Sequence, residues 1–316
     1  MKILITGPLG QDGKILTKIL ENKHELIGVC RLNVPHQKVI DHNKHFKIEL
    51  CMSDLTDIGY VEQLIKSVKP EIIINFAGET NVIDPWSNVY ETFNQNFKIV
   101  FNFLESIKKV NRDIFFFQSS SSLMFGKSKE RIINEKSYFS PLYPYGVSKL
   151  TSHNLLDEYR FKYNIKCCSG IFFNHDSFYR NEKFITKKIS THICDILMGS
   201  KKKLNLYNLN FYRDLSHAED FMKAVEIIIE KKLNENFVFS SGNEVNFLDL
   251  SKKFFYKHNL DFMEFVEYTE DKKDTEFQYN IIGDSTKLKS FGWSPKYNTD
   301  DLINDMVIKE IKYRNR

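Results

Sequence analysis

The sequence has few of the features that mark membrane or secreted proteins. No apolar run approaches the roughly 18 residues that a membrane-spanning helix needs, and no charged leader precedes a long apolar stretch at its start. Cysteine is scarce, and the five cysteines show neither a CxxC spacing nor the pattern of a small disulfide scaffold (Cys30, Cys51, Cys167, Cys168 and Cys194). We therefore expect a cytoplasmic protein with reduced thiols, no membrane segment and no metal site.

A strong charge of one sign is also absent. The chain carries 45 basic and 41 acidic residues, which leaves a net charge of +4. The only dense basic run is Lys201–Lys203, which a solvated turn explains, so we expect no nucleic-acid partner. The 316 residues, 42% of them hydrophobic, can bury a full core as one large domain or two coupled ones.

The sequence does contain a regular alternation of two patterns. Short apolar runs recur along it ("KILIT" 2–6, "ELIGVC" 25–30, "FKIEL" 46–50, "EIIINF" 71–76, "DIFFFQ" 113–118 and "IKCCSGIFF" 165–173). Segments with helical spacing of apolar residues lie between most of them, as at Val61, Leu64 and Ile65. Buried strands separated by amphipathic helices predict an α/β fold, a Rossmann-type doubly wound parallel sheet with its ligand crevice at the carboxyl ends of the strands.

This alternation also suggests how the chain divides. We expect the dinucleotide-binding domain over residues 1–170 and a smaller α/β substrate-binding domain over 171–316. The segment 208–240, with a helix starting near His217 and a strand near Phe237, is expected to return to the first domain. The two predicted domains are therefore interleaved.

A glycine-rich turn, "TGPLGQDG", follows the first predicted strand directly. Gly7 permits the tight turn, Gly10 lets the backbone approach a pyrophosphate, and Gly13 allows close packing of helix and strand. Gln11 and Asp12 belong to the same turn, where unpaired N–H groups and the positive end of the helix dipole would face the phosphates. Three glycines alone could be ordinary turn punctuation, but their place between a strand and a helix favours a dinucleotide site.

The second predicted strand ends in "GVCRLN". NAD-preferring sites usually place an acidic residue there for the ribose 2′-hydroxyl, whereas a 2′-phosphate is better matched by a guanidinium group. Arg31 occupies this position and no carboxylate does. The sequence therefore favours NADP(H) over NAD, the alternative being a surface arginine at the end of a strand.

The segment "YPYGVSK" places Tyr145 and Lys149 four residues apart at the start of a predicted helix, hence on one face. A tyrosine titrates near 10, so at neutral pH it needs a nearby cation to become a useful proton donor and acceptor. Lys149 can supply that charge and can hold the nicotinamide ribose. The pair is a weak motif alone, and it gains weight from the serine run that ends the preceding strand, Ser119–Ser122.

Together these motifs resemble the extended short-chain dehydrogenase/reductases that modify nucleotide sugars, and within them the GDP-mannose 4,6-dehydratase family. The resemblance extends along nearly the whole chain. It rests on the two segments above and on further ones ("SDLTD" 53–57, "FFNHDSFYRNEKFITKKIS" 172–190, "YRDLSHAEDF" 212–221 and "GDSTKLKSFGWSPK" 283–296).

The resemblance implies roles for individual residues. It assigns Asp54 and Leu55 to the adenine pocket of the dinucleotide site. Ala77 and Gly78 would lie along the dinucleotide, and His175 and Arg180 would lie near its nicotinamide half. It assigns the diphosphate of the nucleotide sugar to Asn174, Lys188 and Arg213. Alone, His175 would be taken for a satisfied loop histidine, and Arg213 beside Asp214 could equally form an ion pair.

The family pattern at the end of the fifth strand is a hydroxyl residue, one further residue and a glutamate. Alignment on Phe125-Gly126 makes the hydroxyl Ser121 and places Leu123 at the glutamate position. Ser121 can hydrogen-bond the sugar C4 oxygen with Tyr145, but Leu123 cannot move the protons that elimination of water requires. The nearby candidates for a relocated acid are Glu79 and Asp176.

We therefore predict an NADPH-dependent reductase acting at C4 of a GDP-linked 4-keto, 6-deoxy hexose or heptose, in bacterial-type polysaccharide sugar biosynthesis. Its predicted catalytic residues are Ser121, Tyr145 and Lys149. Three alternatives stay open: a 4,6-dehydratase with a relocated acid, a C4 epimerase, and a non-catalytic nucleotide-sugar-binding paralogue.

The resemblance also implies a homodimer built on the helices around 88–109 and 143–162. The loop after Arg31 is much shorter than in the dehydratases, where it helps to build a tetramer, so a tetramer of that kind is not expected. Lys273 and Glu276 stand where the dehydratases have an arginine and a glutamate, and they match that pattern only loosely.

Overall fold

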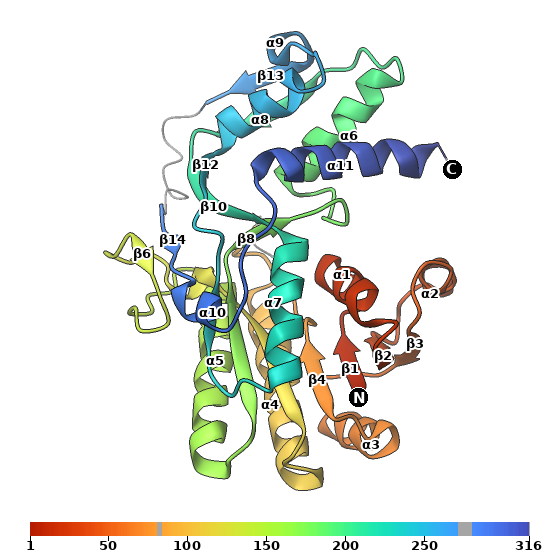
Figure 1. The fold of residues 1–316 in the computed structure, drawn as a ribbon, viewed down its shortest axis with the longest axis vertical. Coiled ribbons are helices and arrows are strands. Elements are labelled where there is room, and N and C mark those ends of the chain that lie inside the picture. Colours follow the sequence, from red (N-terminus) through yellow and green to blue (C-terminus); the bar gives the residue numbers. More distant parts are fainter. Residues whose placement is uncertain (81–83, 271–279, 316) are drawn as a thin grey trace.

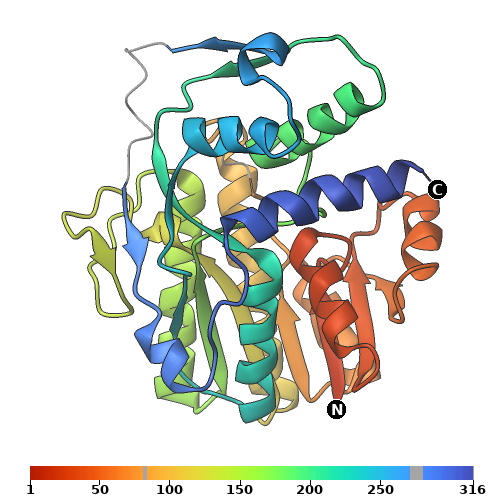
Figure 2. The same cartoon turned by 45° about the horizontal axis from the view of Figure 1, so that its top comes forward.

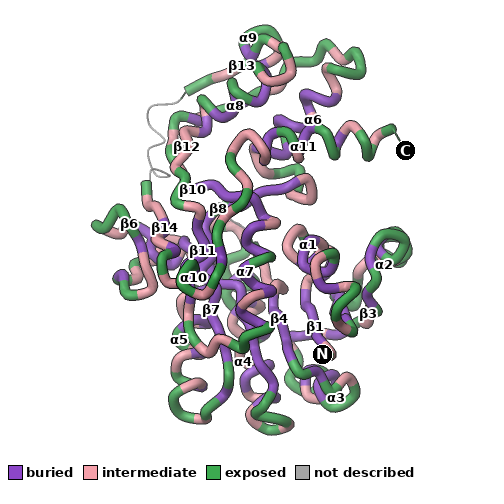
Figure 3. Tube along the Cα trace, in the orientation of Figure 1, coloured by how far each residue is buried: buried purple, intermediate pink, exposed green. Residues whose placement is uncertain are grey.

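The apolar runs of the sequence form the strands of one large sheet in the computed structural model, which describes residues 1–80, 84–270 and 280–315. Seven parallel strands lie in the order β11-β7-β5-β4-β1-β2-β3. Their bounds are β1 Lys2–Thr6, β2 Glu25–Cys30, β3 Glu49–Met52, β4 Ile72–Asn75, β5 Phe115–Ser121, β7 Cys167–Phe172 and β11 Phe237–Phe239. All residues of β4, β5 and β7 are buried because helices cover both faces of the sheet (Figures 1 and 3).

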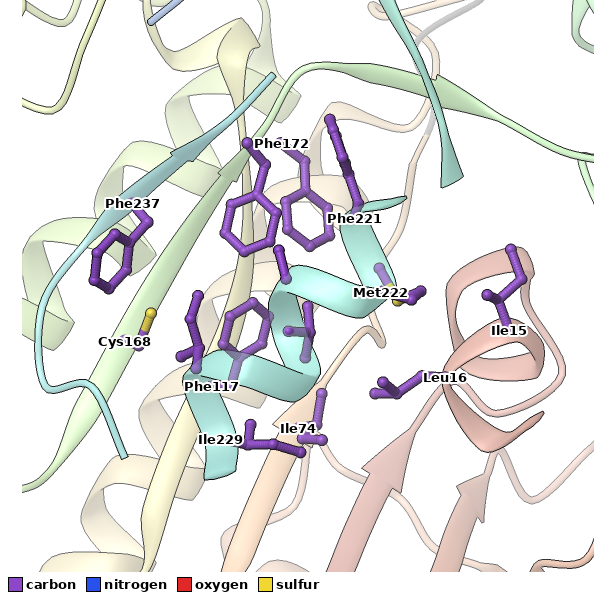
Figure 4. Close-up of a cluster of buried hydrophobic side chains, with 14 of the residues drawn as sticks. Ile15, Leu16, Ile74, Phe117, Cys168, Phe172, Phe221, Met222, Ile229 and Phe237 are labelled. Carbon is purple, nitrogen blue, oxygen red and sulfur yellow. The ribbon is translucent and has the colours of Figure 1, made fainter. Parts of the chain in front are cut away.

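Alternation along β5 divides the core into two layers. Phe115 and Phe117 point to one face of the sheet and Phe116 points to the other. In the first layer Phe117 packs against Phe172, which in turn packs against Phe221 (Figure 4). The first face is covered by α1 (Gln11–Leu20) and α7 (Ala218–Lys231), and the second by α3 (Ile58–Val68), α4 (Val89–Val110) and α5 (Pro144–Tyr163). The predicted α/β fold with a doubly wound parallel sheet is confirmed.

Two elements from the second half of the chain join this sheet. Strand β11 pairs with β7 at the edge of the sheet, and helix α7 packs beside α1 (Figure 1). Strand β10 (Tyr212–His217), which also lies within 208–240, pairs instead with β8 (Asn174–Asp176) and β12 (Glu244–Asn246) in a small sheet. The proposed domain limits of 1–170 and 171–316 stay a prediction.

The small sheet belongs to a second group of elements above the carboxyl ends of the large sheet (Figure 2). This group has its own core, in which Phe254 and Phe255 pack with Met306 and other apolar side chains. Its remaining elements are α6 (Ile185–Leu197), α8 (Phe247–Tyr256), α9 (Phe262–Phe265), α11 (Thr299–Arg314), and the paired strands β9 (Leu204–Tyr207) and β13 (Val266–Thr269).

The shortest elements lie at the periphery of the sheet. Strand β6 (Ile132–Ile133) pairs with β14 (Ile282–Gly283), which is followed by α10 (Thr286–Ser290). Helix α2 (His36–Asn43) follows the short loop after β2, and a single 3₁₀ turn, η1 (Ser122–Met124), follows β5. In the described part of the chain, no helix combines the length and the apolar character needed to cross a membrane.

Candidate active site

A large cleft of about 1670 Å³ opens at the carboxyl ends of β1, β2, β4, β5 and β7, below the small sheet. A pocket for a single small molecule usually measures about 300–1,000 Å³, so the cleft has room for two ligands. This is the edge at which parallel sheets bind ligands. Most of the residues predicted from the sequence line it (Gly7, Gly10, Gln11, Asp12, Gly13, Arg31, Asp54, Leu55, Ala77, Gly78, Ser121, Tyr145, Lys149, Asn174, His175, Arg180 and Arg213).

The glycine-rich turn forms one wall of the cleft. Gly7 has a positive φ of 67°, which favours glycine. A Cβ atom on Gly13 would lie 2.4 Å from the carbonyl oxygen of Gly7, so only glycine allows α1 to pack this closely on the turn. Gly10 is the N-cap residue of α1, and it has no side chain that could accept a hydrogen bond from the first turn of the helix. This first turn lines the cleft.

The second wall follows the ends of β2 and β4. Arg31 comes directly after β2, and its side chain is largely exposed, with a guanidinium nitrogen 3.5 Å from a carboxylate oxygen of Glu79. A Cβ atom on Gly78 would lie 2.6 Å from Oδ1 of Asn96, so the chain passes tightly between α4 and the cleft. The hydroxyl of Ser120 is buried with no hydrogen-bond partner among the described residues, and Ser120 also lines the cleft.

Ser121, Tyr145 and Lys149 come together at the end of β5 and the start of α5. Ser121 shares a hydrogen bond with Tyr145, and its Oγ also accepts one from the Leu123 amide at 3.2 Å. Nζ of Lys149 donates to the carbonyl oxygen of Ser119 at 2.8 Å and lies 5.6 Å from the centre of the Tyr145 ring. The geometry therefore brings together the three residues predicted to be catalytic.

The pKa values of Tyr145 and Lys149 are shifted mainly by burial, and not mainly by the charge of one residue on the other. Burial raises the pKa of Tyr145 to about 12, although the hydrogen bond from Ser121 and the charge of Arg180 oppose it. Burial lowers the pKa of Lys149 to about 8, although the charge of Asp12 opposes it. Tyr145 is thus a protonated donor at neutral pH, and Lys149 is the group that titrates close to neutrality.

Leu123 lies in η1 and lines the cleft beside these residues. The two candidates for a relocated acid are both engaged elsewhere. Glu79 pairs with Arg31. The buried carboxylate of Asp176 forms an ion pair with Arg180, whose Nε lies 2.8 Å away, and accepts a hydrogen bond from Thr186 Oγ1 at 2.7 Å. Asp176 lines the cleft, and Glu79 is not among the described residues that do so.

Two of the three residues predicted to bind the diphosphate of the nucleotide sugar lie at the cleft. Asn174 and Arg213 line it, and the guanidinium group of Arg213 stacks 4.8 Å from the centre of the Phe211 ring. The carboxylate of Asp214 is buried and accepts hydrogen bonds from Ser240 Oγ and the Gly283 amide. Asp214 therefore ties β10 to the ends of β11 and β14.

Lys188 is the predicted site residue that the structure does not bring to the cleft. It is exposed on α6 and is not among the described lining residues. Successive helical side chains point about 100° apart, and the preceding residue, Lys187, takes the inward position, with its Nζ 2.6 Å from Glu310. The role of Lys188 in binding the diphosphate stays a prediction, which its outward position does not support. Lys273 and Glu276 lie outside the described residues.

Sequence reasoning missed one contact in the cleft. Nε2 of His175 lies 3.1 and 3.3 Å from the two carboxylate oxygens of Asp12, although the residues are 163 positions apart. No local pattern pairs them: the glycine-rich turn placed Asp12 in the cofactor site and the resemblance placed His175 there, without a contact between the two. Among the described residues, no group of three or more His, Cys, Asp or Glu side chains is arranged to hold a metal ion.

The family model for GDP-mannose 4,6 dehydratase matches residues 4–306. The chain belongs to the GDP-mannose 4,6-dehydratase family. Within that family it is 30% identical to GDP-mannose 4,6 dehydratase 2 of Arabidopsis thaliana, over 99% of this chain and 87% of that protein. It is 27% identical to a GDP-mannose 4,6-dehydratase of Sordaria araneosa, over 98% of this chain but only 60% of that longer protein.

The fold has close counterparts among solved structures. The crystal structure of dTDP-glucose 4,6-dehydratase from Bacillus anthracis in complex with NAD superposes with a TM-score of 0.84, covering 100% of this chain and 98% of that one at 22% identity. Membership of the dehydratase family confirms the prediction of a nucleotide-sugar enzyme of the short-chain dehydrogenase/reductase type. The reaction, the sugar and the choice between NAD and NADP stay predictions, as does the assignment of Leu123 to the acid position.

Proposed function

We propose that this enzyme carries out redox chemistry at C4 of a GDP-linked sugar without eliminating water, as an NADPH-dependent reductase of a 4-keto-6-deoxy hexose or heptose. The observation that carries the proposal is the composition of the reacting end of the cleft. Ser121, Tyr145 and Lys149 lie together there, and Leu123 lines the same region. The redox residues are present, whereas an apolar side chain stands at the predicted position of the acid.

The cleft fits a nicotinamide dinucleotide. Because Gly13 has no Cβ, α1 packs directly on the turn that begins at Gly7, and this turn lines the cleft. The unpartnered hydroxyl of Ser120 offers one hydrogen-bond donor and acceptor to a ligand there. When bound, the cofactor supplies the hydride for C4, and Arg31 would recognise the 2′-phosphate that distinguishes NADPH from NADH.

Reduction of a C4 ketone also needs a proton for the oxygen that gains negative charge. Tyr145 holds that proton at neutral pH because burial raises the pKa of its hydroxyl to about 12. Ser121, which is hydrogen-bonded to Tyr145, donates to the same oxygen and fixes its position. Lys149 supplies the positive charge that stabilises the tyrosinate left behind, and its charged form prevails below about pH 8.

Elimination of water across C5 and C6 would need a carboxyl group that exchanges a proton with the sugar. Asp176 has both oxygens engaged by Arg180 and Thr186. Asp12 contacts His175, and although burial by itself raises the pKa of Asp12, the contacts with His175 and Arg180 hold it below its usual value. These contacts leave neither Asp176 nor Asp12 free to take the place of an acid at Leu123.

A second candidate function is a 4,6-dehydratase in which another group replaces the acid. Membership of the GDP-mannose 4,6-dehydratase family favours it, because every relative named above carries that activity in its name. A C4 epimerase would use the same three redox residues, with no net consumption of cofactor.

The assembly and compartment are further parts of the proposal. We infer a homodimer built on α4 and α5, whose exposed sides carry Phe93 and Val147. All five cysteines are free thiols, which supports a reducing compartment such as the cytoplasm.

The experiment that separates these functions uses the wild-type protein in two assays. In the first, NADPH and a GDP-4-keto-6-deoxy sugar are supplied, and we expect the nicotinamide absorbance to fall as the C4 alcohol forms. In the second, GDP-mannose is supplied without reductant, and we expect no 4-keto-6-deoxy product. Tyr145→Phe, which retains the ring and removes the proton, is the matched inactive control, with turnover lower by about two to four orders of magnitude. Formation of the 4-keto-6-deoxy product in the second assay would establish the dehydratase instead.

A further inference from the structure

The first turn of α1 and strand β8 are joined by side chains from both elements. Gln11 Nε2 donates to the carbonyl oxygen of His175 at 3.1 Å, and the hydroxyl of Ser177 donates to Gln11 Oε1 at 2.9 Å. The carboxylate of Asp12 contacts Nε2 of His175 at 3.1 and 3.3 Å. We call this set of four residues, Gln11, Asp12, His175 and Ser177, the α1–β8 contact.

The hydrogen bonds of His175 define its protonation state. Nδ1 lies 2.8 Å from the carbonyl oxygen of Phe173, while Nε2 faces the carboxylate of Asp12. Both partners can only accept when Asp12 is ionised, so both ring nitrogens must carry a proton and the ring is positively charged. Burial alone lowers the pKa of His175, but the charge and hydrogen bond of Asp12 outweigh it and leave the pKa above its usual value. Asp12 and His175 therefore form an ion pair at neutral pH.

The ion pair is largely buried at the wall of the cleft, with 11% of the His175 side chain and 21% of the Asp12 side chain exposed. The His175 ring packs 5.3 Å from the centre of the Phe172 ring and 4.8 Å from that of Phe221, two residues of the core beneath the cleft (Figure 4). The other charged groups that act on the pair are Arg180, from the loop after β8, and Lys149 of α5, which faces Asp12. In a setting of this kind, removal of one partner leaves the other charge without compensation, so the pair is costly to break.

The two elements that the pair joins belong to different parts of the cleft. Helix α1 begins at the glycine-rich turn, in the proposed cofactor half. Strand β8 carries Asn174, in the proposed nucleotide-sugar half, and it pairs with β10 in the small sheet rather than with any strand of the large sheet. The α1–β8 contact is therefore a direct connection between the two halves.

We propose that Asp12 and His175 are positioning residues whose ion pair holds β8 against the first turn of α1 and so sets the spacing between the cofactor and nucleotide-sugar halves of the cleft. The assignment of the two halves rests on the proposed function, whereas the connection itself does not. Neither residue donates a proton to the sugar in this proposal. Asp12 acts on Tyr145 and Lys149 through its charge alone.

Hydrogen exchange of the backbone amides, followed by mass spectrometry, tests the connection without any ligand. The variants are Asp12→Asn, which removes the charge with little change in shape, and His175→Gln. In both we expect exchange across residues 174–177 to rise by about tenfold or more, the effect of losing one charge-assisted hydrogen bond, while β5 stays protected. Asp41→Asn is the matched control, because Asp41 is an exposed carboxylate on α2 that bonds to Gln37 and Lys44, and it should leave residues 174–177 unchanged.

The wild-type protein offers a test that needs no substitution. The pKa of His175 is raised, so the ion pair is fully formed below the usual value near 6.5 and is lost as pH rises through the raised value. After correction for intrinsic exchange, the protection of residues 174–177 in the wild-type protein should fall as the pH rises through the pKa of His175. In Asp12→Asn this pH step should be absent or moved to lower pH. Equal protection in wild type and both variants, at every pH, would overturn the proposal.

Binding measurements test the positioning role. With NADPH present, we expect each single variant to weaken GDP binding by about tenfold, and the double variant Asp12→Asn/His175→Gln to be no weaker than either single one, because both changes remove one interaction. Additive losses, or unchanged GDP affinity beside altered exchange, would show that the pair serves only local packing. If wild type binds UDP and not GDP, the proposed substrate is wrong, and the same comparison of variants with UDP still decides the positioning role.

Discussion

Lys149 shows how a buried setting can shift the chemistry of a residue whose type and spacing are evident from the sequence. The motif predicts that Lys149 assists Tyr145, but it contains no information on burial. The structure encloses both side chains, and burial lowers the pKa of Lys149 to about 8 while raising that of Tyr145 to about 12. We therefore expect the lysine, rather than the tyrosine, to limit activity at alkaline pH.

This assignment leads to a prediction for the pH profile of turnover. Because Lys149 stabilises the tyrosinate only when charged, the turnover number should fall as pH rises through about 8. Lys149→Arg keeps a positive charge at every accessible pH, so its turnover, although lower, should show no decline near pH 8. Steady-state rates between neutral and alkaline pH measure this, and a variant with the same alkaline decline as wild type would assign the decline to another group.

Arg31 is the residue that we propose selects NADPH over NADH. Its partner Glu79 lies 3.5 Å away with both side chains well exposed, so the pair contributes little to folding. Arg31→Ala should weaken NADPH binding by about 1.5–3 kcal/mol through loss of charge-assisted bonds to the 2′-phosphate, and NADH binding should barely change. Fluorescence titration with each cofactor measures both affinities. Equal losses for NADPH and NADH would remove the basis for NADP specificity.

At the scale of secondary structure, the long elements follow from the sequence and the short ones do not. The runs that became β1, β2, β4, β5 and β7 are apolar and separated by helical patterns, so the existence of these strands and their parallel direction could be predicted, but not their order in the sheet. Strands β6 and β14 have two residues each and depend on pairing with each other, which no local pattern encodes. The same limit applies to Asp12 and His175, and to Lys188, whose direction depends on where the buried face of α6 lies.

The turn between β1 and α1 supports a prediction at this scale. In Gly13→Ala the added Cβ would lie 2.4 Å from the Gly7 carbonyl and 2.6 Å from Pro8 Cα, both backbone atoms that cannot move separately. We expect a loss of about 1–3 kcal/mol in the free energy of unfolding, the usual cost of overpacking, measured by denaturant titration. Gly59→Ala, in the first turn of α3, is the control, because its Cβ would meet only a side-chain oxygen of the N-cap residue Asp57, at 3.1 Å, and no backbone atom, so the loss should be clearly smaller than in Gly13→Ala.

At the scale of the whole molecule, the chain crosses between its two groups of elements several times. Strand β7 of the large sheet leads into β8 of the small one, β10 leads back into α7, and β11 leads out to β12. Cleft residues therefore come from both groups, and Asn174 and Arg213 face the glycine-rich turn across the same space. Helix α7 and strand β11 lie where the sequence predicts a helix and a strand, but the contacts across the cleft could not be predicted, because they join residues more than 150 positions apart.

The outer side of α4 leads to a prediction about assembly. Phe93, Phe97 and Phe101 stack in a row along this helix, with ring centres 6.3 and 5.6 Å apart. Helix α5 packs beside α4 and adds the exposed Val147 (Figure 1). A row of aromatic side chains at a helix surface is a typical protein interface, and two copies of the α4–α5 pair would bury it as a four-helix bundle.

The expected wild-type species is a dimer, measured as molar mass by light scattering after size exclusion. Phe97→Glu places a charge in the middle of the row and should give a monomer with unchanged thermal stability, because Phe97 is only partly buried in the single chain. Tyr256→Glu is the matched control, since Tyr256 is an exposed aromatic at the end of α8, in the other group of elements, and it should leave the dimer intact. A monomeric wild type would contradict the proposed assembly. A dimer that survives Phe97→Glu would assign the interface to another face of the molecule.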